Sequence, residues 1–207
     1  MNIVLAAIND RLVESWTRIC GNLENVSIHS GSIFEVECDA LVSPANSFGF
    51  MDGGLDLRIS EFFGWHVQDR LQKIIRDRHH GELLVGTAEI VETDSPWIPY
   101  LISAPTMRVP MILKDTVNAY LATRAILILV KYGTLPDGTA IKDMVETIAI
   151  PGMGTGVGLV PPDVCATQMR VAIEDIMLSQ YEFPQSWLHA QRLHQLLYSD
   201  NPRDLQL

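Results

Sequence analysis

The chain has 207 residues, of which 47% are hydrophobic and 19% are charged, a composition typical of a folded globular protein. Its 25 acidic and 15 basic residues give a formal net charge of −10, which argues against broad, sequence-independent binding of nucleic-acid phosphates. No apolar run approaches the roughly 20 residues that span a bilayer, and residues 1–12 lack the basic flank of a signal peptide, so we expect a cytoplasmic protein without membrane contact.

The three cysteines give no sign of a disulfide framework or a metal site. Cys20, Cys38 and Cys165 are far apart in the chain, and none has a second cysteine or a histidine at metal-ligand spacing. We therefore expect reduced thiols in the hydrophobic core, with neither a metal ion nor a cofactor.

The first half of the chain alternates short apolar runs with helical patterns. Strands are expected at residues 2–8, 26–29 and 39–45. Helices are expected between the Asn9-Asp10 cap and Gly21-Asn22, and at residues 55–63 and 67–78. The third strand is apolar on both faces, which is typical of a parallel strand in a sheet covered on both sides.

The second half continues this alternation. Strands are expected at residues 87–92, 100–104 and 147–150. Helices are expected at residues 116–132 and from Pro161-Pro162-Asp163 to about Met177, because proline is tolerated in a first helical turn. A last amphipathic helix should place Trp187, Leu188 and Leu196 toward the body of the protein, and residues 135–143 should form only a surface loop.

Strands that alternate with helices predict an α/β fold. We expect a three-layer α/β/α sandwich with a mixed, mostly parallel sheet. The sequence has no internal repeat, low-complexity tract or linker. A single domain is therefore expected over residues 1–207, with residues 183–207 as a helical extension at the C-terminus.

A glycine-rich segment separates the strand at residues 147–150 from the helix after it. Glycine occupies every other position in the run Gly152, Met153, Gly154, Thr155, Gly156, Val157 and Gly158. Backbone without Cβ atoms can approach a ligand closely, and successive amides can converge on an anion near a helix N-terminus. The segment predicts a phosphate or diphosphate site, with a flexible turn as the plain alternative. It lacks the Gly-Lys-Ser/Thr sequence of a Walker loop.

A second glycine-rich loop follows the strand at residues 39–45. Asn46 stands at the end of this strand, where its amide can donate to and accept from a sugar hydroxyl or, alternatively, cap a turn. Asp52 and Asp56 flank Gly53-Gly54. One of these carboxylates can bind a ribose or act on water, although Asp56 can equally be the first-turn acid of the next helix. Because ligands of open α/β sheets bind at the carboxyl ends of strands, both loops should share one edge.

Taken together, these motifs resemble the macro domain, a family that binds ADP-ribose. The resemblance extends from about residue 31 to residue 177 and depends on the order of both loops. The residues that carry it are Asp39-Ala40-Leu41-Val42, Asn46, Gly53-Gly54-Leu55-Asp56 and residues 151–158.

The resemblance implies roles for individual residues. Asn46 would meet the distal ribose, Gly53-Gly54 would lie beneath the ribose and diphosphate, and residues 152–158 would wrap the diphosphate. In hydrolytic members, an asparagine and an aspartate at the positions of Asn46 and Asp56 assist attack of water at the anomeric carbon. Asn46 and Asp56 are therefore the candidate catalytic residues, and Ser43 is a further candidate for ligand binding.

The chain departs from the family pattern around the ligand. Gly31-Ser32-Ile33 replaces the usual Gly-Asp-Ile, whose aspartate holds the adenine amino group. Asp52 stands where the family has a further glycine, and Leu57-Arg58 follow Asp56 in place of small residues.

The ends of the chain also differ from the family. Macro domains commonly finish with a strand, a polar turn and a helix, whereas this chain begins with such a unit, from Ile3 through Asn9-Asp10 to Ile19. We expect a circularly permuted sheet, in which the first strand occupies the position of the usual last strand. Asn9 and Asp10 would then lie at the adenine end and replace the lost aspartate.

These residues leave several functions open. The chain is either a module that binds ADP-ribose or an ADP-ribosylated molecule, or an enzyme that removes ADP-ribose or a phosphate from an ester with Asn46 and Asp56. A nicotinamide-dinucleotide enzyme from another α/β family is the alternative from a different class.

Overall fold

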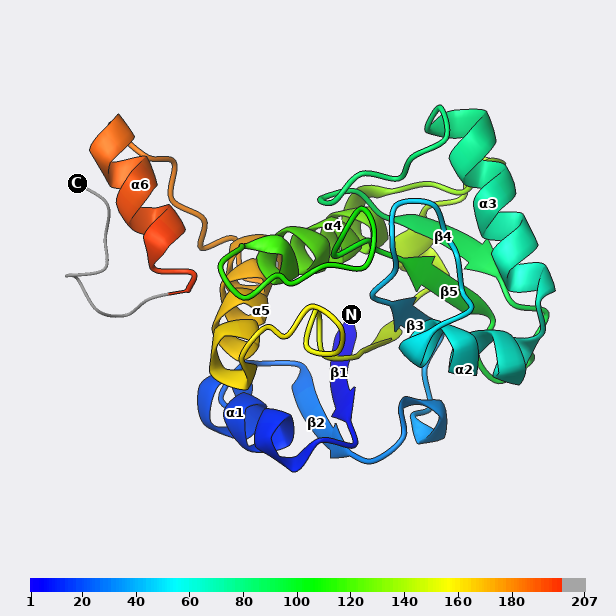
Figure 1. Ribbon diagram of the computed structural model, residues 1–207, viewed down its shortest axis with the longest axis horizontal. Coiled ribbons are helices and arrows are strands. Elements are labelled where there is room, and N and C mark those ends of the chain that lie inside the picture. Colours follow the sequence, from blue (N-terminus) through cyan, green and yellow to red (C-terminus); the bar gives the residue numbers. More distant parts are fainter. Residues whose placement is uncertain (199–207) are drawn as a thin grey trace.

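The structure, a computed structural model, describes residues 1–198 (Figure 1). Its strands form one six-stranded sheet in the order β2-β1-β6-β3-β5-β4. Their bounds are β1 Asn2–Ala7, β2 Val26–Ser30, β3 Ala40–Ser43, β4 Glu89–Glu92, β5 Tyr100–Ser103 and β6 Thr147–Ile150. Neighbouring strands pair in parallel except β4, which pairs antiparallel with β5. The predicted mixed, mostly parallel sheet is confirmed.

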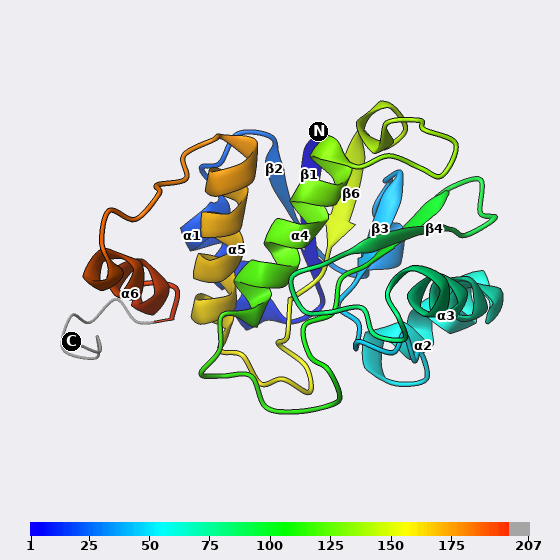
Figure 2. The same cartoon turned by 90° about the horizontal axis from the view of Figure 1, so that it is seen from above.

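Helices cover both faces of this sheet (Figure 2). The helices are α1 Asp10–Cys20, α2 Gly54–Phe63, α3 His66–Arg78, α4 Asn118–Tyr132, α5 Pro162–Met177 and α6 Trp187–Gln195, with short 3-10 turns at Ile33–Glu35 and Ile141–Asp143. One hydrophobic cluster joins the sheet to α1, α4 and α5, and a second joins it to α2 and α3. The three-layer α/β/α prediction is therefore correct.

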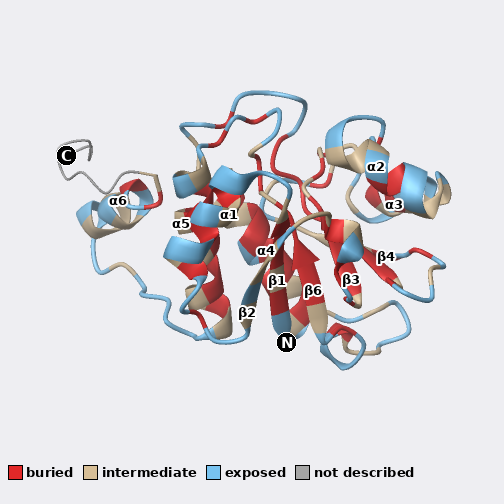
Figure 3. Cartoon of the chain, turned by 90° about the horizontal axis from the view of Figure 1, so that it is seen from below, coloured by how far each residue is buried: buried red, intermediate tan, exposed pale blue. Residues whose placement is uncertain are grey.

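The alternation of side chains along the central strands explains this double cover. Ala40 and Val42 of β3 belong to the cluster under α1, α4 and α5, whereas Leu41 between them belongs to the cluster under α2 and α3. All are fully buried, and the central strands are the most buried part of the fold (Figure 3). The strand is apolar throughout because both of its faces contact helices.

Asp39 fastens the start of β3 to the start of β6. One of its carboxylate oxygens accepts hydrogen bonds from the backbone N–H groups of Glu146, at 2.9 Å, and Thr147, at 2.8 Å. The aspartate that helped to identify this strand in the sequence therefore contributes to sheet pairing.

β1 lies inside the sheet, parallel to β2 on one side and to β6 on the other. Its carboxyl end consequently lies beside the strand that leads into residues 152–158. A permuted sheet requires this position of the first strand. The permutation itself stays a prediction.

The prediction for the last helix was wrong. In α6, Trp187 is 79% exposed, and Leu188 and, just after the helix, Leu196 are also exposed rather than packed on the body. The helix lies beyond α5, outside the three layers (Figures 1 and 3). A hydrophobic stripe defines a face of a helix but not what covers it. Residues 199–207 of the expected extension lie outside the described residues.

The prediction of a mere surface loop at residues 135–143 also needs correction. Backbone bridges pair Thr134 with Ala140, and Ile141 is buried in the cluster beneath α4. Within the described residues, no helix is both long and apolar enough to cross a membrane.

We predict that a chain ending at Glu182 folds as stably as the full chain. No described residue of α6 belongs to either hydrophobic cluster, so its removal leaves the core intact. The midpoint of thermal unfolding should change by less than about 3 °C, the shift that corresponds to roughly 1 kcal/mol at this chain length. A fall well beyond this value, or loss of a single cooperative transition, would show that residues 183–207 belong to the core.

Candidate functional site

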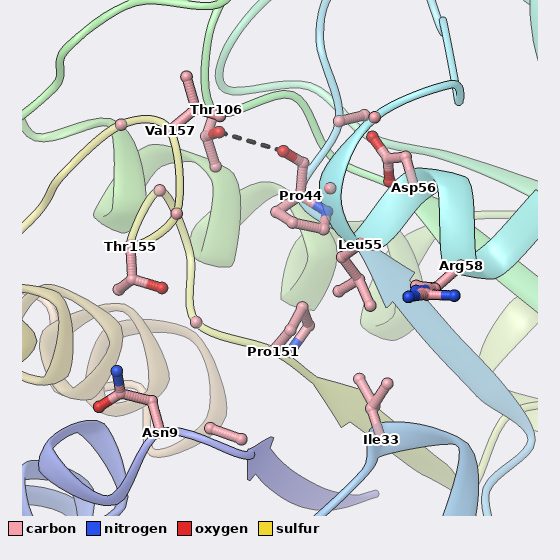
Figure 4. Close-up of a pocket in the computed structure, with 18 of the residues that line it drawn as sticks. Asn9, Ile33, Pro44, Leu55, Asp56, Arg58, Thr106, Pro151, Thr155 and Val157 are labelled. Carbon is pink, nitrogen blue, oxygen red and sulfur yellow. Dashed lines mark hydrogen bonds between the residues drawn. The ribbon is translucent and has the colours of Figure 1, made fainter.

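A cavity of about 730 Å³ opens at the carboxyl ends of the parallel strands (Figure 4). It is lined by the end of β1 and by the loops that follow β2, β3, β5 and β6. Its volume lies within the range of small-molecule sites, and its position matches the usual location of ligands in open α/β sheets.

Most of the predicted site residues line this one cavity. They are Asn9, Asn46, Gly53, Gly54, Asp56, Gly152, Gly154, Thr155, Gly156, Val157 and Gly158. The predicted ligand contacts Asp10, Ser43 and Met153 are not among the residues that line it. Met153 and Ser43 are fully buried beneath the surface, and Asp10 faces solvent in the first turn of α1. Asp10, Ser43 and Met153 lie close to cavity residues along the chain, but the sequence did not predict the direction of their side chains.

Three glycines of the two loops face open space, whereas Gly152, Gly154 and Gly158 are packed against neighbouring atoms. A Cβ atom added to Gly53, Gly54 or Gly156 would meet no other atom within 4 Å. Gly54 also has a φ of +56°, which favours glycine over residues with a side chain. Bare backbone therefore lines the cavity at these positions.

α2 presents its N-terminus to the cavity. Gly53 is the N-cap residue, and no side chain caps the helix. The amides of its first turn, whose intrahelical partners are missing by geometry, are consequently available to an anion in the cavity. The sequence predicted the anion near the N-terminus of the helix that follows residues 152–158, which is α5. α5 begins at Pro162, beyond the last cavity residue of the second loop, Gly158, and its first residue has no N–H to donate.

The side chain of Asn46 braces its own loop. Its Oδ1 accepts hydrogen bonds from the N–H groups of Phe48, at 3.1 Å, and Phe50, at 3.3 Å, and its Nδ2 donates to the carbonyl of Phe50 at 2.8 Å. The oxygen has two acceptor positions and both are used, so one N–H remains for a ligand. The prediction that this amide both donates to and accepts from a sugar needs correction, because only donation is left.

Asp56 is a partly buried carboxyl group at the cavity wall. Ser43, fully buried at the end of β3, donates a hydrogen bond of 2.5 Å to its Oδ1. Burial raises the pKa of Asp56 from 3.8 to about 6, although the bond from Ser43 acts in the opposite direction. Ser43 therefore orients Asp56, a role that its place next to the loop did not reveal.

Polar groups at the other end of the cavity are partly engaged. Ser32 accepts a hydrogen bond from Phe34 N and caps the Ile33–Glu35 turn, so it does not replace an aspartate as a free acceptor. Asn9 caps α1 by accepting from Leu12 N at 3.2 Å. Arg58, which extends from α2 in Figure 4, is the one cationic side chain among the cavity residues of the described part of the chain, and it pairs with Glu61 at 2.9 Å.

The loop after β5 completes the wall, and sequence reasoning assigned it no ligand contact. Thr106, Met107 and Pro110 line the cavity. Thr106 donates a hydrogen bond to the carbonyl of Pro44, which fixes this loop against the one that carries Asn46 (Figure 4). Among the described residues there is no group of three or more His, Cys, Asp or Glu that could hold a metal ion.

Comparison with known proteins identifies the family. The sequence profile described as "Macro domain" matches residues 42–169 of this chain. The chain belongs to the macro domain family. An uncharacterized protein of Aquifex aeolicus is 34% identical to this macro domain over 153 residues, which cover 73% of this chain and 81% of that protein.

Solved macrodomains share the fold. The macrodomain of Mycobacterium tuberculosis DarG matches with a TM-score of 0.57 at 17% identity, over 70% of this chain and 88% of that one. A mutant of the Oceanobacillus iheyensis macrodomain with ADPR matches with a TM-score of 0.59 at 21% identity, over 73% of this chain and 77% of that one. At these identities the likeness establishes the macro fold, and the resemblance seen in the sequence is confirmed.

We predict that replacing Asp56 by Asn stabilises the protein more at high pH than at low pH. The folded state holds the pKa of Asp56 at about 6, against 3.8 for a free carboxyl, so its contribution to stability is complete below pH 3.8 and is lost as the pH rises through 6. Over this window the difference is on the order of 3 kcal/mol.

Urea unfolding of both proteins at about pH 4 and about pH 8 measures this difference. Asp52→Asn, which removes an exposed carboxylate from the same loop, is the matched control and should show little pH-dependent gain. Equal effects of the Asp56→Asn substitution at both pH values would contradict the raised pKa.

Proposed function

We propose that this macro domain binds ADP-ribose, free or attached to another molecule, with the diphosphate between the two glycine-rich loops. The observation that carries the proposal is the open space in front of Gly53, Gly54 and Gly156. A diphosphate in that space can accept hydrogen bonds from backbone amides, including those of the first turn of α2. Amides suit this cavity because its charged side chains are mostly acidic, and carboxylates alone would repel the ligand.

We place the two ribose groups of ADP-ribose at opposite ends of the cavity. In our proposal, the distal ribose lies near Asn46 and Asp56, and the remaining N–H of Asn46 donates to one of its hydroxyls. The adenosine lies toward Asn9 and Ile33, at the opposite end in Figure 4. There the Nδ2 group of Asn9 faces the base, while the oxygen stays on the cap of α1.

The proposal includes the circular permutation. β1 lies between β2 and β6 in the sheet, and Asn9, which follows β1, thereby reaches the cavity. Asp10 points to solvent in this arrangement, so Asn9 alone would take the place of the missing aspartate.

We also propose that the site hydrolyses an ADP-ribosyl ester, because Asp56 combines access to the cavity with a raised pKa of about 6. Above that pH its carboxylate can take a proton from water. The water oxygen forms a bond to the anomeric carbon as the bond from that carbon to the ester oxygen breaks. The electron pair of the broken bond leaves with the carboxylate product. If the substrate carries a phosphate on the anomeric carbon instead, the same step releases phosphate as the leaving group.

Calorimetric titration with ADP-ribose tests the binding proposal. We predict that Gly53→Val and Gly156→Val each weaken ADP-ribose at least about tenfold, because their side chains fill the space for the diphosphate. Gly156→Val should not lower thermal stability, since the new Cβ meets no atom within 4 Å. Gly53→Val should lower it slightly, because Gly53 is the N-cap of α2 and valine is a poor N-cap residue.

Gly156→Ala is the milder control, and its single methyl group should weaken binding less. NAD, titrated in parallel, should bind more weakly than ADP-ribose, because the nicotinamide would displace the distal ribose from Asn46. Family membership sets aside a dinucleotide enzyme of another α/β fold. Absence of heat with millimolar ADP-ribose would refute the binding proposal.

The hydrolysis proposal has its own test. We predict that Asp56→Asn lowers turnover of an ADP-ribosyl ester at least about 100-fold, which is the usual contribution of a general base, and keeps most of the affinity for ADP-ribose. The rate of the unaltered protein should rise as the pH increases through about 6, where Asp56 loses its proton. If the protein binds ADP-ribose but hydrolyses no ADP-ribosyl ester, the hydrolysis proposal is refuted and the domain is a binding module.

A further inference from the structure

Three loops that line the cavity carry a group of exposed apolar side chains, which we call the apolar rim. Its side chains are exposed to solvent although they are large and hydrophobic, and they are Phe50, Val109, Met111, Ile112, Val157 and Leu159. Phe50 and Val157 also line the cavity, so the rim is continuous with it. In Figure 4, Val157 lies at the end opposite Asn9 and Ile33. This is the end where the proposed function places the distal ribose.

Backbone hydrogen bonds hold the loops of the rim together. Ser47 N, in the loop that carries Phe50, contacts the carbonyls of Met107 at 3.1 Å and Arg108 at 3.2 Å. Leu113 N, at the end of the next loop, donates to the carbonyl of Gly158 at 2.7 Å, and its side chain is only 1% exposed. The loops after β5 and β6 run side by side in Figures 1 and 2. The exposed apolar residues are therefore displayed from a fixed base.

Leu159 shows that this exposure is costly. Its φ is +53°, in the left-handed region that disfavours residues with a branched or bulky side chain, yet the side chain is 60% exposed. Glycine or asparagine would adopt this conformation with less strain. Neither local conformation nor packing of the described chain accounts for a leucine here.

The charges of the rim favour a protein over a nucleic acid as the partner. Arg108 forms two hydrogen bonds with the carboxylate of Glu82, at 2.9 and 2.6 Å, and its charge is thereby neutralised. Asp52 and Asp115 stand in the same loops with Lys114, and the chain has a net charge of −10. Nucleic-acid surfaces are recognised through clusters of cationic side chains, which this rim lacks among the described residues.

We propose that the rim binds an apolar segment of the protein that carries the ADP-ribose. This inference rests on the proposed function, because the group attached to the distal ribose must leave the cavity across the rim. Residues with aliphatic or aromatic side chains next to the modified position would cover Met111, Ile112 and Leu159. The domain would then distinguish ADP-ribosylated proteins by the sequence around the modification.

A pair of synthetic peptides tests this proposal. Both carry one ADP-ribose on the same residue through a linkage that is not an ester, so that the proposed hydrolysis does not remove it, and this residue is flanked by leucine and phenylalanine in one peptide and by serine in the other. In calorimetry, the apolar peptide should bind about tenfold more tightly than the serine peptide. It should also bind about tenfold more tightly than free ADP-ribose. The variant Met111→Ser/Ile112→Ser/Leu159→Asn should abolish this advantage and leave the affinity for free ADP-ribose unchanged, because these side chains do not line the cavity.

The control variant Met144→Ser/Leu178→Ser/Leu188→Ser removes exposed apolar side chains elsewhere and should keep the peptide preference. Leu159→Asn alone should not lower the unfolding temperature, since asparagine accepts this backbone conformation.

Each other outcome overturns the inference in a recognisable way. Equal affinity for both peptides, with free ADP-ribose bound, refutes the rim as a protein site and leaves the proposed function standing. Failure to bind free ADP-ribose refutes the proposed function itself. Tighter binding of an ADP-ribosylated oligonucleotide than of the apolar peptide would assign the rim to nucleic acid. Concentration-dependent association that the rim variant abolishes would assign it to a second copy of the chain.

Discussion

The proposed site depends on a constraint at one edge of the sheet, where backbone without side chains faces the cavity. Gly53 and Gly54 follow β3, Gly156 follows β6, and all three face open space. The strands that carry them are hydrogen-bonded neighbours, so the two loops meet across the cavity. A side chain at any of these positions would extend into the cavity and, in the proposed function, would occupy the space of the diphosphate.

The polar side chains of the site serve the fold and the cavity together. Asn46 uses three of its hydrogen bonds to hold the loop that contains Phe50. Ser43 directs Asp56 from below, and burial opposes the ionisation of that carboxyl group. Stability therefore favours the protonated form of Asp56, whereas a base requires the ionised form. Such opposition between stability and chemistry is common at functional sites.

The periodicity of hydrophobic residues was sufficient to predict the three layers and the positions of the loops, but not the direction of individual side chains. Buried strands such as residues 40–43 and the helices beside them have strong local patterns, and their bounds were predicted within a few residues. Ser43, Asp10 and Met153 are close in sequence to cavity residues, yet none of them lines the cavity. Ser43 and Met153 are buried, in β3 and in the loop after β6, and Asp10 faces solvent at the start of α1. The packing of Trp187 was also beyond prediction, since it depends on where an irregular segment carries α6. Thr106 and Pro110 have no motif, and only the pairing of β3 with β5 brings their loop to the site.

The proposed permutation is compatible with an intact site because the order of elements along the chain does not determine their contacts. In a parallel sheet, a helix that follows a strand runs back to the edge where the next strand begins. α5 follows β6 and packs beside α1, while β1 pairs with β6. A connection from the end of α5 to the start of β1 would therefore restore the usual family order without moving a strand. Only this connection would change, and the start of β1 lies beside the start of β6, at the edge opposite the cavity, where a new connection leaves the glycine loops undisturbed.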